Sequence, residues 1–282
     1  MLKTNYHTHS RYCDGTGSPA EYAEAAVRRG LKALGFSSHA PVSAPVSYDS
    51  AWTMNPEDLP AYLADIRKLK TNPPGDLQVY AGLEIDYIHG LTGPDAYKDR
   101  GLDFTIGAVH MLRNSDDGRH LSVDGPDEEF ETLLRRTFGG DMRAFVKEYY
   151  TLLSELIENH SFSFLAHFDL IKKKNRDNRY FDENASWYRK CALEPLTLAA
   201  EKGIPLEINS GGISRGAIDS VYPSPWLLKE AHDRSVPILI NSDAHRPAHV
   251  DFCFKESLGI CRDTGYREVR VLVDGGWRDE EI

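Results

Sequence analysis

The sequence predicts an α/β barrel. Short apolar runs with the character of strands alternate with helical patterns from end to end, which is typical of parallel strands joined by helices. Seven such units precede a last strand, which favours a barrel over its structural competitor, an open doubly wound sheet. The 282 residues contain no repeat, low-complexity tract or change in composition that would mark a linker. We therefore expect one domain over residues 1–282.

The predicted elements follow one another closely. The first strand covers Tyr6–His9, and the first helix has a serine N-cap, a proline in its first turn, a glutamate at its third position and a glycine at its end. Those four residues are Ser18, Pro19, Glu21 and Gly30. Further strands are predicted at residues 33–37, 78–86, 104–110, 163–169, 204–209, 236–242 and 268–273. Helical patterns include residues 59–69, 142–158 and 226–234.

Composition excludes several classes of protein. A net charge of −10 argues against a protein that binds duplex DNA, which would present a basic face. The sequence has no apolar run long enough to cross a membrane, and its first ten residues lack the apolar core of a signal peptide. The four cysteines are scattered and form no CxxC pair, as expected of reduced thiols in a cytoplasmic protein.

Histidines and carboxylates gather at the ends of the predicted strands. They are His7, His9, His39, Glu84, His110, His167, Asp243 and His245. A barrel would bring these strand ends around one mouth, at the face where functional residues collect. Imidazole nitrogens and carboxylate oxygens are ligands of zinc, manganese and iron. The repeated pattern therefore predicts a metal site, although a single histidine or H-x-H pair would be a weak signal.

Six short motifs around these residues resemble those of a known superfamily. They are HTHSRYCDG at 7–15, SSHAP at 37–41, GLEIDY at 82–87, GAVHML at 107–112, LAHFDL at 165–170 and NSDAH at 241–245. Their order and residues are similar to the PHP (polymerase and histidinol phosphatase) superfamily, and most similar to its monofunctional histidinol-phosphate phosphatases. The resemblance implies a distorted (β/α)7, TIM-like barrel with about three divalent ions of zinc, manganese or iron at its C-terminal mouth.

The resemblance also implies how the ligands are shared among the metals. The first metal would take His7, His9, Glu84 and Asp243; the second, Asp14, His39 and His245; the third, Glu84, His110 and His167. Glu84 would then bridge two metals, and Glu84 and Asp243 would be essential to catalysis. Divalent ions of this kind can supply a bridging hydroxide for direct in-line attack on a phosphate monoester.

Other residues are candidates for holding the substrate. Arg215, in a glycine-rich segment after the sixth strand, is expected to grip phosphate oxygens. One cation of the run Lys172–Arg176 is a further candidate. Asp86 shares a strand face with Glu84 and could accept a substrate ammonium or orient a histidine ligand. Tyr48 and Trp52 could cover an imidazole, although ordinary packing of their loop is the preferred interpretation.

The leading hypothesis is hydrolysis of L-histidinol phosphate to L-histidinol and phosphate in histidine biosynthesis. The expected partner is thus a small phosphate monoester, with no nucleic acid and no membrane; the sequence does not define an oligomeric state. One alternative keeps the chemistry but acts on another phosphorylated metabolite or a nucleotide. A second alternative is a non-catalytic metal-binding barrel, against which the complete ligand set argues.

Overall fold

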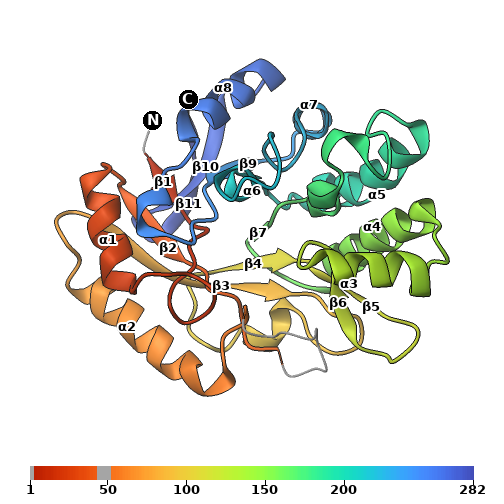
Figure 1. Cartoon of the computed structure of the whole chain (residues 1–282). Helices are drawn as coiled ribbons and strands as arrows, with labels where there is room; N and C mark the ends of the chain where they lie inside the picture. Colours follow the sequence, from red (N-terminus) through yellow and green to blue (C-terminus); the bar gives the residue numbers. More distant parts are fainter. Residues whose placement is uncertain (1–2, 43–51) are drawn as a thin grey trace.

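A sheet of parallel strands lies at the centre of the computed structural model, which describes residues 3–42 and 52–282. Its strand order is β1-β2-β3-β4-β7-β8-β9, and each neighbouring pair is parallel. Helices surround this sheet (Figure 1). The strands are Thr4–Asn5 (β1), Ala33–Phe36 (β2), Gln78–Asp86 (β3), Phe104–Ala108 (β4), Phe164–Leu165 (β7), Leu206–Asn209 (β8) and Ile238–Asn241 (β9). The predicted α/β barrel is confirmed.

The sheet nearly closes between its first and last strands. Thr8 and Ala244, which follow β1 and β9, form a parallel bridge. The His9 N–H donates to Ala244 O at 2.9 Å, and the Ala244 N–H donates to His7 O at 3.1 Å. The closing contact therefore lies among candidate metal ligands, and it brings the two ends of the sheet to one place at the mouth.

Helices connect most of the strands. The α-helices are Pro19–Arg28 (α1), Leu59–Thr71 (α2), Asp127–Thr132 (α3), Met142–Asn159 (α4), Ser186–Lys202 (α5), Gly211–Ser214 (α6), Pro225–Asp233 (α7) and Phe254–Thr264 (α8). Short 3₁₀ or π turns are η1 (Pro56–Asp58), η2 (Pro94–Tyr97), η3 (Leu133–Thr137), η4 (Leu170–Lys174), η5 (Arg176–Asn178) and η6 (Pro247–His249). The predicted capping box of α1 is present, since Ser18 and Glu21 cap each other's backbone N–H groups.

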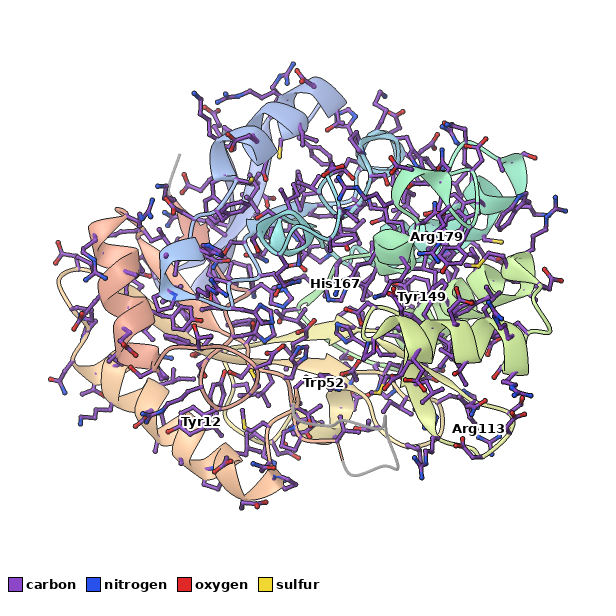
Figure 2. The ribbon with its side chains drawn as sticks, in the orientation of Figure 1. Tyr12, Trp52, Arg113, Tyr149, His167 and Arg179 are labelled. Carbon is purple, nitrogen blue, oxygen red and sulfur yellow. The ribbon has the colours of Figure 1, made fainter. Side chains whose placement is uncertain are left out.

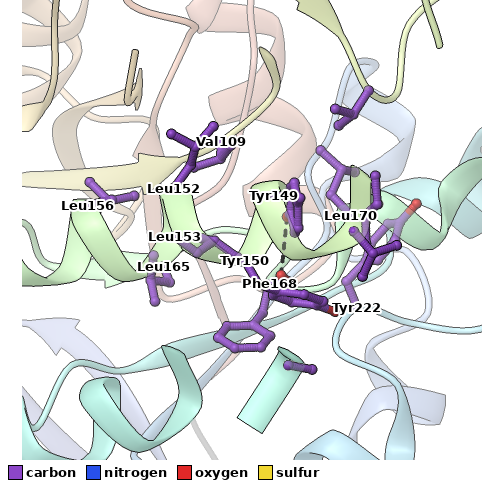
Figure 3. Packing of buried hydrophobic residues seen from close by; sticks show 14 of the residues in the cluster. Val109, Tyr149, Tyr150, Leu152, Leu153, Leu156, Leu165, Phe168, Leu170 and Tyr222 are labelled. Carbon is purple, nitrogen blue, oxygen red and sulfur yellow. Dashed lines mark hydrogen bonds between the residues drawn. The ribbon is translucent and has the colours of Figure 1, made fainter. Parts of the chain in front are cut away.

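Helix α4 shows how the core holds the mouth in place. One face of α4 buries Tyr149, Tyr150, Leu153 and Leu156 against the sheet (Figure 3). The Tyr149 hydroxyl donates to Phe168 O at 3.2 Å, so its polar end is satisfied within the core. Phe168 is fully buried and directly follows His167 in the sequence. Packing on this side of the barrel therefore fixes the backbone that carries a candidate metal ligand.

Two antiparallel hairpins were not predicted. Met111–Arg113 (β5) pairs with His120–Ser122 (β6) beside the mouth. The predicted last strand is present as Glu268–Val273 (β10), but it pairs with Gly276–Glu281 (β11) in a separate sheet. The buried Tyr6 hydroxyl bonds to both the N–H and the C=O of Leu272, at 2.8 and 2.9 Å. This second hairpin is thus attached to the barrel without joining its sheet.

The predicted first strand, Tyr6–His9, is wrong, because β1 covers Thr4–Asn5; several other barrel strands end earlier than predicted at the mouth, whereas β3 and β8 end where predicted. Strand β1 ends at Asn5, so His7 and His9 lie beyond it, and His110 and His167 lie two residues past β4 and β7. These four histidines therefore lie in the segments that follow the strands at the mouth. All four cysteines are free thiols, as expected. Within the described residues, no helix combines the length and apolar character needed to cross a membrane.

Candidate metal centre and active site

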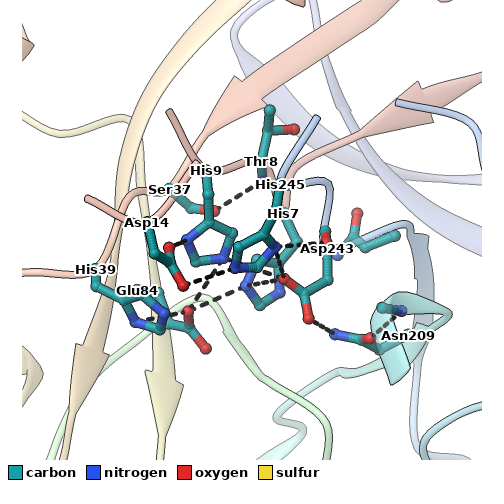
Figure 4. A network of polar contacts seen from close by, with 12 residues as sticks. His7, Thr8, His9, Asp14, Ser37, His39, Glu84, Asn209, Asp243 and His245 are labelled. Carbon is teal, nitrogen blue, oxygen red and sulfur yellow. Dashed lines mark hydrogen bonds and ion pairs between the residues drawn. The ribbon is translucent and has the colours of Figure 1, made fainter. Parts of the chain in front are cut away.

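Nine sequence-predicted ligands meet at the C-terminal mouth of the barrel. They are His7, His9, Asp14, His39, Glu84, His110, His167, Asp243 and His245. All of them except His110 and His167 are labelled in Figure 4. Seven of them are buried; the side chains of Asp14 and His245 keep 32% and 19% of their surface exposed. Their coordinating atoms fall into overlapping groups of three or four, each within 4.8 Å of one another. The topology therefore brings together ligands that are up to 238 positions apart in the sequence, from His7 to His245.

The first group consists of His7, His9 and Asp243. The Oδ1 atom of Asp243 lies 3.1 Å from Nε2 of His9 and 3.7 Å from Nε2 of His7. Asp243 has a φ of 51°, a left-handed conformation that is uncommon for aspartate. The extended conformation of β9 is therefore interrupted at Asp243. His245 Nδ1 and Asp243 Oδ1 lie 3.4 Å apart.

The second group contains His9 in addition to the expected Asp14, His39 and His245. Asp14 Oδ2 lies 3.0 Å from Nε2 of His245, and Asp14 Oδ1 lies 3.4 Å from Nδ1 of His9. Gly15 permits this loop to fold tightly, because a Cβ atom there would lie 2.5 Å from Ser10 N. The loop thus places Asp14 beside the other candidate ligands, and its neighbour Gly15 tolerates the close backbone approach that this requires.

Glu84 lies between the groups, and its two oxygens face different histidines. Oε2 is 3.1 Å from both His7 Nε2 and His39 Nδ1. Oε1 is 2.9 Å from His167 Nε2 and 3.6 Å from His110 Nε2. Glu84, His110 and His167 form the third group, as the resemblance implied. This arrangement is what a carboxylate that bridges two metal ions requires.

The donor set fits divalent transition metals. Buried atoms with no hydrogen-bond partner include His7 Nε2, His9 Nε2, His39 Nδ1, Glu84 Oε2 and Asp243 Oδ1. Such atoms are costly to bury unless they bind something, and these five face one another at the mouth. Nitrogen and carboxylate oxygen ligands suit zinc, manganese and iron. The chemistry of the residues present therefore fits bound divalent metal.

The electrostatics of the site reflect its mixture of buried charges. Burial opposes ionisation of Glu84, but His7, His39 and the other histidines hold its pKa well below the usual value. Burial lowers the pKa of His39 to about 4, so its imidazole is neutral at physiological pH. Burial also acts against protonation of His110, yet Asp86 and Glu84 raise its pKa to about 10. The negative charge of Glu84 and Asp86 thus favours a cation beside them.

Two buried carboxylates contact histidines of the candidate metal centre, and the first of them, Asp86, also forms a candidate metal group with His39 and His110. Asp86 Oδ1 accepts from the His110 backbone at 3.2 Å and lies 2.7 Å from its Nδ1. Asp86 is buried and does not line the cavity. Of the two roles considered for Asp86, this geometry favours orientation of a ligand over contact with substrate.

Sequence reasoning missed Glu207, the second of these carboxylates. It is fully buried in β8, and Oε1 and Oε2 lie 3.0 and 2.9 Å from Nδ1 of His7. It also accepts from His167 N at 3.0 Å, Asn209 Nδ2 at 2.7 Å and Asn241 Nδ2 at 2.9 Å. A glutamate within an otherwise apolar strand was the available signal, because a buried charge needs partners.

A cavity of about 300 Å³ opens beside the ligands. Its wall includes Arg215, Lys173, Asp124 and Trp52. Arg215 Nη2 lies 2.9 Å from Asp243 Oδ2, and Nη1 lies 2.9 Å from His245 Nδ1. Gly211 makes room for this contact, since a Cβ atom there would lie 2.3 Å from Asp243 Oδ2. Arg215 is therefore held in the cavity wall beside two candidate metal ligands, Asp243 and His245.

The cationic side chains of the run Lys172–Arg176, which follows β7, point to different parts of the structure. Lys172 is buried away from the cavity, 3.1 Å from Asp169 Oδ2 and 2.6 Å from Ser224 Oγ. Lys173 reaches the cavity wall, where its Nζ lies 2.7 Å from Asp124 Oδ2. Lys174 and Arg176 form ion pairs with exposed aspartates. Lys173 is thus the cation of this run that lines the cavity, a choice that could not be made from the sequence.

Trp52 also forms part of the cavity wall, contrary to the expectation of simple loop packing. Its ring centroid lies 4.8 Å from that of His39 and 5.8 Å from that of His110. Trp52 and His167 both lie near the middle of the molecule in Figure 2, whereas Tyr12 and Arg113 are peripheral. Tyr48, the other aromatic residue considered, lies outside the described residues.

Comparisons with known proteins agree with this site. The PHP domain family matches residues 5–211. The chain belongs to the PHP domain family. A protein of Deinococcus radiodurans named a probable histidinol-phosphatase is 34% identical over 93% of this chain and 94% of its own. The resemblance seen in the motifs is therefore confirmed.

Two solved structures share the fold. HisK of Listeria monocytogenes has a TM-score of 0.80 at 20% identity, covering 90% of this chain and 99% of its own. A histidinol phosphate phosphatase of Lactococcus lactis, complexed with zinc, L-histidinol and phosphate, has a TM-score of 0.71 at 20% identity, covering 98% of each chain. Both support the distorted, TIM-like (β/α)7 barrel expected from the sequence.

Proposed function

We propose that this protein hydrolyses L-histidinol phosphate to L-histidinol and inorganic phosphate. The observation that carries the proposal is one cavity lined by both candidate metal ligands and two cationic side chains, Arg215 and Lys173. Membership of the PHP domain family supports metal-dependent phosphoester chemistry. The names of the Deinococcus and Lactococcus proteins support this particular substrate.

The ligand residues would hold about three divalent ions of zinc, manganese or iron. His7, His9 and Asp243 would form one position; Asp14, His39 and His245 a second; His110 and His167 a third, with Glu84 shared. Such ions lower the pKa of bound water and neutralise charge on phosphoryl oxygens. The zinc in the Lactococcus complex is consistent with this proposal.

The remaining cavity residues would bind and orient the ester. The Arg215 guanidinium can grip two phosphoryl oxygens at once, which fixes the phosphorus relative to the centre. Lys173, in the turn η4, can contribute a further positive charge to the cavity. The Trp52 ring offers an apolar, aromatic surface against which an imidazole can stack. Partial burial of the mouth would limit access of bulk water.

A phosphate-release screen tests the proposal. The metal-loaded protein would be assayed against a panel of phosphorylated metabolites, including L-histidinol phosphate, sugar phosphates and nucleotides. We expect L-histidinol phosphate to give the highest kcat/KM. A clearly higher value for another phosphate monoester would assign the same chemistry to a different substrate. Absence of phosphate release from the entire panel would contradict an enzymatic role.

A further inference from the structure

A carboxylate in the cavity wall has no function in the account above. Asp124 lines the same cavity as Arg215 and the metal-ligating residues, yet it belongs to none of the potential metal groups among the described residues. A negative charge beside a phosphate dianion is repulsive. Its position in the proposed phosphate-binding cavity suits a bound molecule that carries a positive charge in addition to its phosphate.

The local structure holds this carboxylate firmly. Asp124 follows β6, and the neighbouring Val123 N–H donates to His110 O at 2.8 Å. Ser122 Oγ donates to Asp124 Oδ1 at 2.8 Å, and Lys173 Nζ lies 2.7 Å from Oδ2. An ionised carboxylate has about four acceptor positions. These two side-chain contacts orient Asp124 while leaving it able to accept from a ligand.

We propose that Asp124 recognises an ammonium group on the substrate and selects for phosphate monoesters that carry one. This inference rests on the proposed function, because L-histidinol phosphate has its ammonium on the carbon beside the one that bears the ester oxygen. The ammonium and the phosphate of this substrate are close together, and so are the carboxylate of Asp124 and the ammonium of Lys173. Its ammonium faces Asp124 while its phosphate meets Lys173 and Arg215. Asp124 thus takes the ammonium-binding role that was considered for Asp86.

The decisive experiment removes the carboxylate charge of Asp124 in one arm and the ammonium charge of the substrate in the other. Asp124→Asn and the wild type would be assayed with L-histidinol phosphate and with 3-(imidazol-4-yl)propyl phosphate, which lacks only the amine. We expect Asp124→Asn to lower kcat/KM about 10- to 100-fold for the amine-bearing ester. The value for the amine-free ester should stay close to that of the wild type, so the preference for the amine disappears.

A matched control is available at Asp127, which lies three residues after Asp124 and is the first residue of α3. Asp127→Asn removes a carboxylate that pairs with Lys174 and is 75% exposed. This change should leave kcat/KM for both esters at wild-type values. Equal losses for both esters in Asp124→Asn would show that Asp124 only supports Lys173 or the loop, and would overturn the proposal. Unchanged values for both esters would overturn it as well.

A measurement on the wild type alone keeps the proposal testable if Asp124→Asn fails to fold. L-histidinol should inhibit more strongly than 3-(imidazol-4-yl)propan-1-ol; equal inhibition would contradict recognition of the ammonium. Failure of the proposed function can be distinguished from failure of the proposal for Asp124. If neither imidazole ester is hydrolysed but other monoesters are, phosphoethanolamine and ethyl phosphate provide the same comparison in wild type and Asp124→Asn. A selective loss with phosphoethanolamine then supports the role of Asp124, and equal effects overturn it.

Discussion

Both oxygens of the Glu207 carboxylate lie within 3.0 Å of Nδ1 of His7, so Glu207 orients the ring whose Nε2 faces Glu84. Replacement by glutamine keeps the shape but adds an N–H₂ group among donors from Asn209 and Asn241. We expect Glu207→Gln to lower metal affinity or activity about 10- to 100-fold. Metal titration and steady-state kinetics would measure this. Glu201→Gln, at an exposed position of α5, is the control.

Glu84 should be more sensitive to substitution than Asp86. Glu84→Gln removes the anionic oxygens that face two pairs of histidines, whereas Asp86→Asn affects the orientation of His110 alone. We expect Glu84→Gln to lose most activity together with bound metal, and Asp86→Asn to lose about 10- to 100-fold. Elemental analysis and kcat would be compared. Near-normal metal content and turnover in Glu84→Gln would exclude a bridging role.

Arg215 should act on phosphate and not on metal retention. Arg215→Ala is expected to lower kcat/KM by about 2–4 kcal/mol, or roughly 30- to 1000-fold, while metal content stays unchanged. Arg215→Lys should recover only part of this loss, because a point charge cannot reproduce a bidentate fork. Inorganic phosphate should inhibit Arg215→Ala more weakly than the wild type. Unchanged kinetics and inhibition would leave Lys173 as the candidate phosphate ligand.

Neighbouring lysines should respond differently to the same substitution. Lys172→Met leaves Asp169 unpaired in the interior, and we expect the free energy of unfolding to fall by about 3–5 kcal/mol. Lys173→Met should change stability much less, because its ammonium borders the cavity, but it should lower kcat/KM. Denaturant unfolding and kinetics of both variants would test this. Similar losses of stability in the two would contradict the assignment.

Glycines at two sites provide a steric test. Gly211→Ala places a Cβ 2.3 Å from Asp243 Oδ2, so we expect displacement of Asp243 and loss of metal and activity. Gly259→Ala lies within α8, where no heavy atom is within 4 Å of the added Cβ. That variant should be more stable by about 0.5–1 kcal/mol, because alanine favours the helix. Wild-type metal content in Gly211→Ala would show that the loop adapts.

The ligands could be predicted from the sequence because barrel geometry places strand ends at one mouth. His39 and His110 needed only the correct order of strands and helices. Exact strand ends could not be predicted: β1 covers Thr4–Asn5, whereas the sequence pattern predicted a strand over Tyr6–His9. The antiparallel hairpin of β10 depends on pairing with β11, whose exposed, charged residues carry little strand signal.

Supporting residues were harder to predict than ligands. Glu207 contacts His7 from 200 positions away, so its role follows only from tertiary structure. Lys172 and Lys173 are adjacent in one short turn, and nothing in their sequence tells which faces the cavity. The placement of Asp124 depends on the unpredicted β5–β6 hairpin. The sequence therefore indicates the chemistry, whereas substrate recognition requires the packing around it.

The most direct test of the account combines metal analysis with phosphate release from L-histidinol phosphate. The purified protein would be assayed as isolated, after removal of metal by a chelator, and after addition of zinc, manganese or iron. The account predicts bound transition metal in the isolated protein, loss of phosphate release with the metal, and recovery when one of these ions is restored. Full hydrolysis of L-histidinol phosphate by protein shown to be free of metal would contradict it.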